Sequence, residues 1–309
     1  MLRVLAAALV LALAPAAGAA TAREQQVAGP ISSVAAAGID VAYADQYRRG
    51  CHEVRLWNVA TRGDRRLASH CFVSTSTGSG VAGAIATQGR ALWLTYTGGN
   101  IREWSLWTKG SLTTARRIAF LAADVDGPPP VILGSVWESS LPYAIGRTII
   151  VLAPNGSRRF SLTAADRVVY LSAHSRGYAV VLANGRVLSI SPAGKLIRER
   201  TFAPGAAQTA LLAAPGLIVE TPAGLQIHGA VSVRTVALPP GARLLGYSEG
   251  IAAYGIGREL RLRRLANGSD RLFRRLEPRF HAQLGRRGIG YGSGRTLGFS
   301  VWAIVSGAV

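Results

Sequence analysis

The stretch VVYLSAHSRGYAVVLANGRVLSIS, residues 168–191, decides the fold. It contains three short runs rich in Val, Leu, Ile and Tyr, and turns that end in Gly177 and Gly185 separate them. Runs of this length and composition between glycine turns are typical of β-strands. Asn184-Gly185 is also the pair that type I′ hairpin turns prefer, because both central positions need positive φ. The stretch therefore predicts an antiparallel meander.

The same arrangement recurs along the chain with an average period of about 42 residues. This period is typical of the four-stranded blades of a β-propeller, and seven copies are within the range of known propellers. We therefore predict an all-β fold, a seven-bladed β-propeller of four-stranded antiparallel blades; the alternative is a large β-sandwich. The turn glycines that mark the copies are Gly38, Gly89, Gly146, Gly177, Gly216, Gly250 and Gly288.

The ends of the repeat region decide how the ring would close. The first strand of each copy has small side chains, which suits strands crowded around a central axis. The seventh copy shows about three strands before Val309, so one outer strand is missing. We predict that Gln25–Ile31 supplies it, and that residues 23–309 form a single propeller domain with about seven repeats.

The N-terminal residues have the pattern of an export signal. Arg3 precedes an apolar run from Val4 to Ala17, and small residues follow up to Ala22. A basic start, a short apolar core and an A-x-A site are typical of a secretory signal peptide, and the run is too short to span a bilayer. We predict a signal peptide over residues 1–22, cleaved after Ala19 or Ala22, and a secreted protein of the extracellular space or cell envelope without a transmembrane anchor. The alternative is a buried N-terminal helix.

Two cysteines, Cys51 and Cys71, flank two strand-like runs around a turn at Thr61–Asp64. Their midpoint is residue 61, so a hairpin would place the two cysteines nearly opposite each other. Only directly opposed positions on neighbouring strands are close enough for a bridge. Because export leads to an oxidising compartment, we predict a disulfide between them; the alternative is two free thiols.

The formal charge of +19 comes from 35 Lys and Arg residues against 16 Asp and Glu residues. The basic residues are all arginines except Lys109 and Lys195. Abundant Ala, Gly, Arg and Pro indicate a GC-rich bacterial genome, which explains part of this excess. Proteins that bind nucleic acid usually cluster their charge, whereas Leu and Phe interrupt the basic stretches Arg258–Arg264 and Arg271–Arg279. We therefore expect a basic monomer whose partner is an unknown protein or an anionic envelope polymer, with no nucleic acid.

One segment carries a family resemblance. VRLWNVATRGDRRLASH, Val54–His70, resembles a WD-repeat in the strand ending at Trp57, the turn and the final His. Trp107 and Trp302 echo the pattern, whereas Asn58 stands where the family usually has Asp. The resemblance implies a propeller used as an interaction platform, a fold that carries many functions. Four tryptophans are expected to pack between blades: Trp93, Trp104, Trp107 and Trp137.

Motifs for catalysis and metal binding are weak. Gly246–Gly250 matches G-x-S-x-G, but that motif needs a strand-to-helix turn, and here it is in register with the hairpin turns. His52 and His70 would meet across the first hairpin, where we expect a structural role. Asp124–Gly127 resembles half of a calcium loop, but Pro128–Pro130 follows at once. We therefore predict no catalytic residue, no cofactor and no metal.

Loops offer the better binding surface. Asp45–Arg49 and Thr97–Asn100 link second to third strands, Asp124–Pro130 links two copies, and in a propeller such links share one face. Tyr and Arg are residue types that anchor interfaces. We predict an exported binding module, and more weakly an extracellular hydrolase or lyase that acts on glycan or ester at the channel mouth. The predicted partner-binding rim is Tyr47, Arg48, Arg49, Asn100, Asp124 and Asp126.

Overall fold

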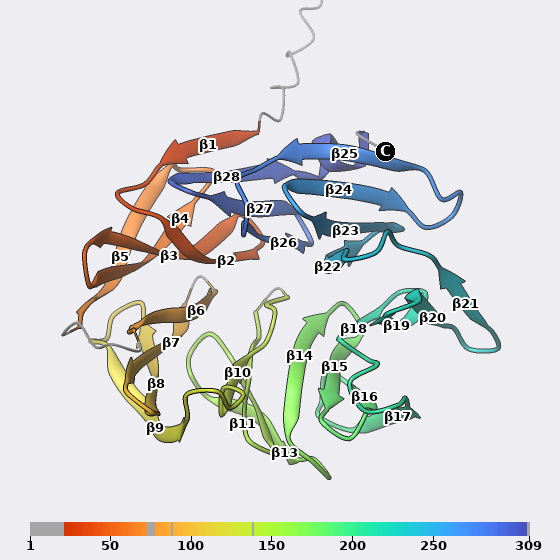
Figure 1. Ribbon diagram of the computed structural model, residues 1–309, viewed down its shortest axis with the longest axis horizontal. Helices are drawn as coiled ribbons and strands as arrows, with labels where there is room; N and C mark the ends of the chain where they lie inside the picture. Colours follow the sequence, from red (N-terminus) through yellow and green to blue (C-terminus); the bar gives the residue numbers. More distant parts are fainter. Residues whose placement is uncertain (1–21, 73–77, 88, 138, 308–309) are drawn as a thin grey trace, which may run out of the picture.

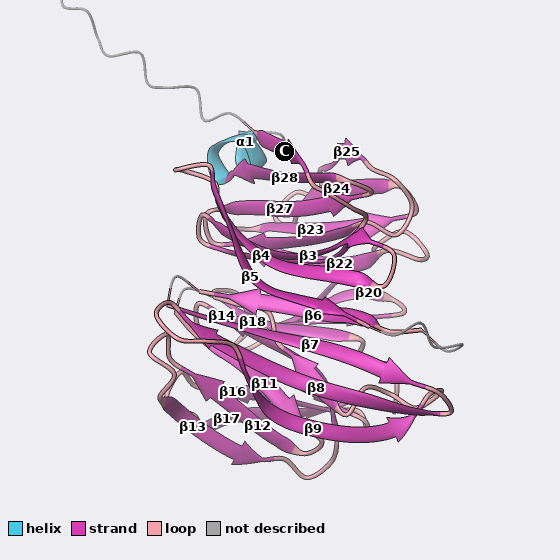
Figure 2. Cartoon of the chain, turned by 90° about the vertical axis from the view of Figure 1, so that its left-hand side faces the viewer, coloured by secondary structure: helices cyan, strands magenta, loops and turns pink. Residues whose placement is uncertain are grey.

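The computed structural model describes residues 22–307 except 73–77, 88 and 138. Most of the predicted signal peptide, residues 1–21, lies outside this part. Seven four-stranded antiparallel sheets form a ring around a central axis (Figure 1). The fold prediction, a seven-bladed β-propeller, is confirmed. In the described part of the chain, one short helix, α1 (Trp302–Gly307), follows the last strand (Figure 2).

Each blade contributes one strand to each of four concentric layers. The innermost strands, which define blades 1 to 7 in order, are β2 (Ile31–Ala37), β6 (Gly80–Ala86), β10 (Val131–Leu133), β14 (Val168–His174), β18 (Thr209–Ala213), β22 (Arg243–Ser248) and β26 (His281–Gly285). The second strands are β3 (Asp40–Arg48), β7 (Arg90–Gly98), β11 (Leu141–Ile145), β15 (Gly177–Leu182), β19 (Gly216–Thr221), β23 (Ile251–Ile256) and β27 (Gly288–Ser293).

The outer two layers follow the same order. The third strands are β4 (Cys51–Asn58), β8 (Ile101–Gly110), β12 (Thr148–Leu152), β16 (Arg186–Ile190), β20 (Gly224–His228), β24 (Glu259–Arg264) and β28 (Thr296–Val301). The outermost strands are β5 (Gly63–Cys71), β9 (Arg116–Asp124), β13 (Arg158–Thr163), β17 (Leu196–Thr201), β21 (Val233–Val236), β25 (Asp270–Arg275) and, in blade 7, β1 (Arg23–Gln26).

An N-terminal strand closes the ring, as predicted, although its bounds differ. β1 pairs antiparallel with β28, and Glu24 lies opposite Gly298. The prediction of Gln25–Ile31 was too late in the chain, because Ile31 already begins the innermost strand of blade 1. The segment between β1 and β2 lies beside the turn between β27 and β28, where Val27 N donates a hydrogen bond to Arg295 O at 2.9 Å.

The hydrophobic core lies between neighbouring blades. Val54 of blade 1 packs in one buried cluster with Val81 and Trp93 of blade 2. Trp57 of blade 1 packs with Phe299 of blade 7 across the closing interface. Burial of such apolar area is the main term that stabilises the ring, so each blade depends on its neighbours.

A polar clasp ties the strands of blade 6 together. Tyr254 of β23 donates its hydroxyl hydrogen bond to Asp270 of β25, and Arg261 Nε of β24 donates to the same carboxylate at 2.9 Å. Burial and the Asp270 carboxylate raise the pKa of Tyr254 to about 12. The hydroxyl therefore stays protonated and can serve as a donor at neutral pH.

The clasp recurs in the two blades that follow blade 6 around the ring. In blade 1, Tyr43 donates to Asp64 at 2.7 Å and Arg55 Nε donates to Asp64 at 3.1 Å. In blade 7, Tyr291 donates to Glu24 of β1 at 2.5 Å, and the Arg that pairs with Glu24 is Arg274 of blade 6, at 3.2 Å. A hydrogen bond from a Tyr hydroxyl to a carboxylate therefore holds the outermost strand in blades 1 and 7, which lie on either side of the closing interface.

Blade 3 departs from the pattern, which explains why its copy lacks the first turn glycine. β10 ends at Leu133, and the chain then runs beside β14 of blade 4 instead of turning directly into β11. Ser135 forms a parallel bridge with Ser172, and Ala173 N donates to Ser135 O at 3.2 Å. This excursion brings Trp137 to the central axis.

Within the described residues, no helix is both long and apolar enough to cross a membrane.

Candidate functional site

The two cysteines form the predicted disulfide in blade 1. Cys51 and Cys71 are register partners across β4 and β5, and their Cα atoms are 4.1 Å apart. Near the turn, Asn58 lies opposite Gly63, a register that alone would place Cys51 opposite His70. A one-residue bulge at the buried Leu67 shifts the pairing and brings the two cysteines face to face.

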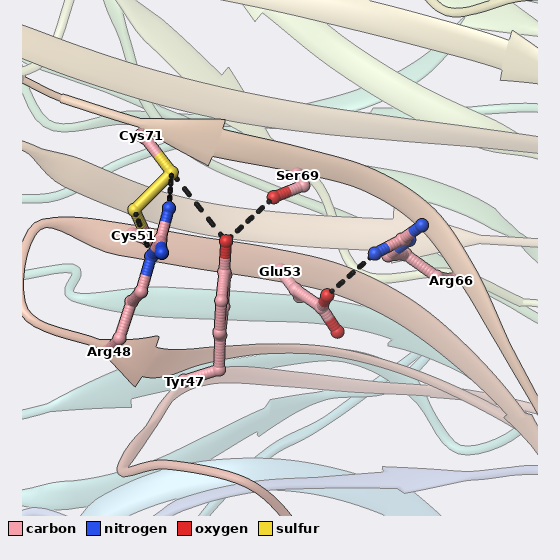
Figure 3. The surroundings of a disulfide bond; sticks show 7 residues. All are labelled: Tyr47, Arg48, Cys51, Glu53, Arg66, Ser69 and Cys71. Atoms are coloured by element: carbon pink, nitrogen blue, oxygen red, sulfur yellow. Dashed lines mark hydrogen bonds and ion pairs between the residues drawn. A yellow bond between two sulfur atoms is a disulfide. The ribbon is translucent and has the colours of Figure 1, made fainter.

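The disulfide braces the turn between β3 and β4 (Figure 3). Arg48 Nε donates to Cys51 Sγ at 3.1 Å, and the Tyr47 hydroxyl is 3.3 Å from Ser69 Oγ. The Arg48 guanidinium also lies over the Tyr47 ring, 5.7 Å from its centroid. Arg48 and Arg49 are exposed and Tyr47 is half-buried, so this turn presents a fixed basic and aromatic surface.

The other predicted rim residues meet in blade 2. Val125 N donates to Asn100 O, and Gly127 N donates to Asp124 O, both at 3.0 Å. Asn100, Asp124 and Asp126 are exposed there. Within the described residues, no hydrogen bond or ion pair connects this corner to Tyr47–Arg49 of blade 1. The prediction that the six residues form one continuous rim therefore remains a prediction.

Both groups lie at the end of the propeller where the outermost strands finish and the innermost strands begin. We call this end, which holds the turns near Arg49 and Asn100 and the link 124–130, the loop-rich face.

A groove of about 770 Å³ also lies on the loop-rich face, between blades 6 and 7. Its charged lining alternates in sign: Glu24, Glu259 and Glu277 with Arg258, Arg274 and Arg275. The sequence does not indicate this groove, because only ring closure brings Glu24 beside blade 6.

A cavity of about 300 Å³ follows the central axis and is lined by all seven blades. Its described lining contains no carboxylate; one cation, Arg243, lines it together with polar side chains such as Ser33, Thr209 and Gln283. The Trp137 ring stacks on the His174 ring with centroids 3.9 Å apart. Trp137 thus lines the cavity as well as packing against the core of blades 3 and 4.

His174 joins two blades across the axis. Its Nε2 is 2.7 Å from the Tyr247 carbonyl oxygen of blade 6, and its Nδ1 is 3.0 Å from Ser175 Oγ. Since a carbonyl only accepts, Nε2 carries the hydrogen, and burial lowers the pKa of His174. The neutral ring and Trp137 therefore line the cavity at the end where β14 and β22 finish.

The weak motifs have structural surroundings. Ser248 and Glu249 of the G-x-S-x-G match lie at the hairpin between β22 and β23. His52 lies opposite His70, and Trp93 Nε1 donates to His70 Nε2 at 2.8 Å. In the part of the chain that the structure describes, no three His, Cys, Asp or Glu side chains are placed to hold a metal ion.

Comparison with known proteins finds similarity only among solved structures. No family model and no curated protein matches the sequence. A chain of the mitotic checkpoint complex is 15% identical with a TM-score of 0.57, and the match covers 96% of this chain and 99% of that chain. Sqt1 of Saccharomyces cerevisiae is 11% identical (TM-score 0.51; 91% and 98% covered), and the Pan2 WD40 domain of Neurospora crassa is 14% identical (TM-score 0.50; 89% and 90% covered). These similarities show a WD40-like β-propeller fold.

Proposed function

We propose that the chain is an exported, WD40-like interaction module of bacterial origin whose loop-rich face binds a protein partner in the cell envelope or extracellular space. Export is supported by the leader pattern of residues 1–22 and by the Cys51–Cys71 disulfide, because disulfides persist in oxidising compartments. The fold is commonly used for interaction, and the surface of the loop-rich face indicates the kind of partner.

The braced turn Tyr47–Arg49 is the observation that carries this proposal. Tyr and Arg are enriched among the residues that dominate binding energy. The disulfide and the Arg48–Cys51 contact hold the turn before any partner arrives, and a group that is already ordered loses less entropy on binding.

The charge pattern of the loop-rich face favours a protein over a polyanion. Asp124 and Asp126 are exposed on it, and acidic and basic side chains alternate in the groove between blades 6 and 7. A uniform polyanion would be repelled at each carboxylate, whereas a protein surface can match both signs.

The alternative function, a hydrolase or lyase, receives less support. Glycoside hydrolysis commonly uses a pair of carboxylates beside the scissile bond, and the described residues that line the central cavity include none. Reproducible turnover of glycans or esters by the purified protein would favour this alternative.

Capture of partners from the organism's own cell envelope tests the proposal. The mature protein and the R48A/R49A variant serve as baits, and R116A/R158A, which removes two exposed arginines outside the loop-rich face, is the matched control. We expect R48A/R49A to bind the captured protein about tenfold more weakly or worse, while the control binds as the wild type does. Equal capture by all three baits would contradict the proposal.

A further inference from the structure

The opposite end of the propeller carries exposed basic side chains from most of the blades. This end, where the innermost strands finish and the outermost strands begin, we call the turn-rich face; it holds the hairpins near Gly38, Arg176 and Arg286. We propose that the turn-rich face binds an extended acidic polysaccharide. This inference goes beyond the role of the loop-rich face, since it concerns another surface and another class of ligand.

Contacts between blades assemble this face. Arg90 Nη2 of blade 2 donates to Asn155 O of blade 3 at 3.1 Å. Lys109 Nζ of blade 2 donates to Leu67 O of blade 1 at 2.9 Å. A pocket of about 420 Å³ is lined by turns of blades 1, 2, 3 and 7, among them Gly38, Pro154 and Arg287. The turns of these blades therefore form one continuous surface.

Exposed cations follow one another from blade to blade on this surface. Several occupy the first residues of outermost strands, which form the perimeter of the ring (Figure 1). The remainder lie in the hairpin turns. They are Arg62, Arg65, Arg116, Arg117, Arg158, Arg159, Arg176, Lys195, Arg286 and Arg287. Because they are spread over several blades instead of converging on one pocket, they suit a polymer better than a small anion.

The acidic residues at this end are engaged by other groups of the protein. Asp64 and Asp270 belong to the clasps of blades 1 and 6. Asp40 is buried and accepts a hydrogen bond from Asn58 Nδ2 at 2.7 Å, and Glu249 accepts one from Trp302 Nε1. Among the described residues, no carboxylate forms an ion pair with Arg116, Arg117, Arg158 or Arg159. Glu138 is outside the described residues.

The side chains favour a polysaccharide with carboxylate groups. A guanidinium can bind a carboxylate through two parallel hydrogen bonds. Arg117 lies over the ring of Phe120 at 4.9 Å, and Phe120 is 51% exposed, so a cation and an apolar surface stand together. Proteins that bind single-stranded nucleic acid stack successive bases on several aromatic side chains, whereas Phe120 is the one aromatic among the strongly exposed large apolar residues described.

Binding to polygalacturonate, with neutral dextran and oligothymidylate as further probes, tests the inference. The mature protein is compared with R116Q/R158Q and with R48Q/R49Q, which removes the same charge from the loop-rich face. We expect R116Q/R158Q to bind polygalacturonate about tenfold more weakly and with a shallower salt dependence. R48Q/R49Q should change the affinity less than about twofold, and dextran should not bind.

Three results would overturn the inference. The first is that the protein does not bind polygalacturonate at low salt. The second is an equal loss of affinity for polygalacturonate in R116Q/R158Q and R48Q/R49Q. The third is that oligothymidylate binds more tightly than polygalacturonate. Melting temperatures equal to that of the wild type would show that the variants are folded. Retention of the envelope protein by R116Q/R158Q would show that the two faces act independently, so that failure of one proposal leaves the other testable.

Discussion

At the scale of single residues, a polar unit that recurs in this propeller is the clasp of one Tyr hydroxyl, one Arg and one carboxylate. The Arg and Asp of the clasp are nine residues apart in both blade 1 and blade 6. This spacing is visible in the sequence, but its meaning depends on the strand register. In blade 1 the bulge at Leu67, which side-chain alternation does not predict, lies beyond the clasp and changes the register of the cysteines instead. The disulfide was predictable because its cysteines lie nearly symmetrically about the turn.

We predict that Tyr254→Phe lowers the free energy of unfolding by about 1.5–3 kcal/mol, the range for hydrogen bonds to charged groups. The loss arises because Asp270, half-buried beside Arg261, no longer receives the hydroxyl hydrogen bond. Urea denaturation would measure it. The matched control is Tyr178→Phe, since Tyr178 is also buried but its hydroxyl forms no hydrogen bond within the described residues. Equal effects of the two substitutions would contradict a role for the clasp.

At the scale of elements, β1 closes the ring with only four residues. It contributes the ladder to β28, the Glu24 acceptor for Tyr291, and the Arg274–Glu24 ion pair at 3.2 Å. Deletion of residues 23–29 from the mature protein would expose the edge of β28 and leave the Tyr291 hydroxyl without its acceptor. We therefore expect the melting temperature to fall by more than about 5 °C.

Calorimetry of the deletion variant and of Glu24→Gln separates the two contributions of β1. Glu24→Gln keeps the ladder but weakens the contacts to Tyr291 and Arg274, so its melting temperature should lie between those of the wild type and the deletion. An unchanged melting temperature after deletion would mean that blade 7 is stable with three strands. The need for a closing strand followed from counting strands, whereas its bounds depended on where Ile31 enters blade 1.

For the whole molecule, the repeat predicted the ring, because seven similar units that each bury their faces against neighbours have few other arrangements. The two faces were less predictable. Charges that are scattered in sequence, such as those of Arg116, Arg158 and Arg176, come to one end only through the alternation of strand direction. Trp137 was expected between blades, and its place at the axis depends on the excursion after Leu133, which no motif indicates.

The whole molecule should also lose stability as the pH falls, because the pKa values of all five histidines are lowered by burial. In the unfolded chain these groups have a pKa near 6.5, so below neutral pH the unfolded state binds more protons than the folded state. Stability then rises with pH across this window and is fully present above pH 6.5. The five residues are His52, His70, His174, His228 and His281.

Urea midpoints measured between pH 8 and pH 5.5 would check this dependence. His70 should contribute strongly, because protonation of Nε2 removes the acceptor of the Trp93 indole hydrogen bond. His70→Gln retains an acceptor that does not titrate, so its midpoint should vary less with pH. Burial raises the pKa of Asp40 and Asp45, which gives these groups the opposite sign in a window that extends upward from their reference pKa of 3.8, so the comparison with His70→Gln isolates the histidine contribution. A urea midpoint that stays constant or rises as the pH falls to 5.5 would contradict this prediction. It would mean that protonation of the histidines does not lower the free energy of unfolding.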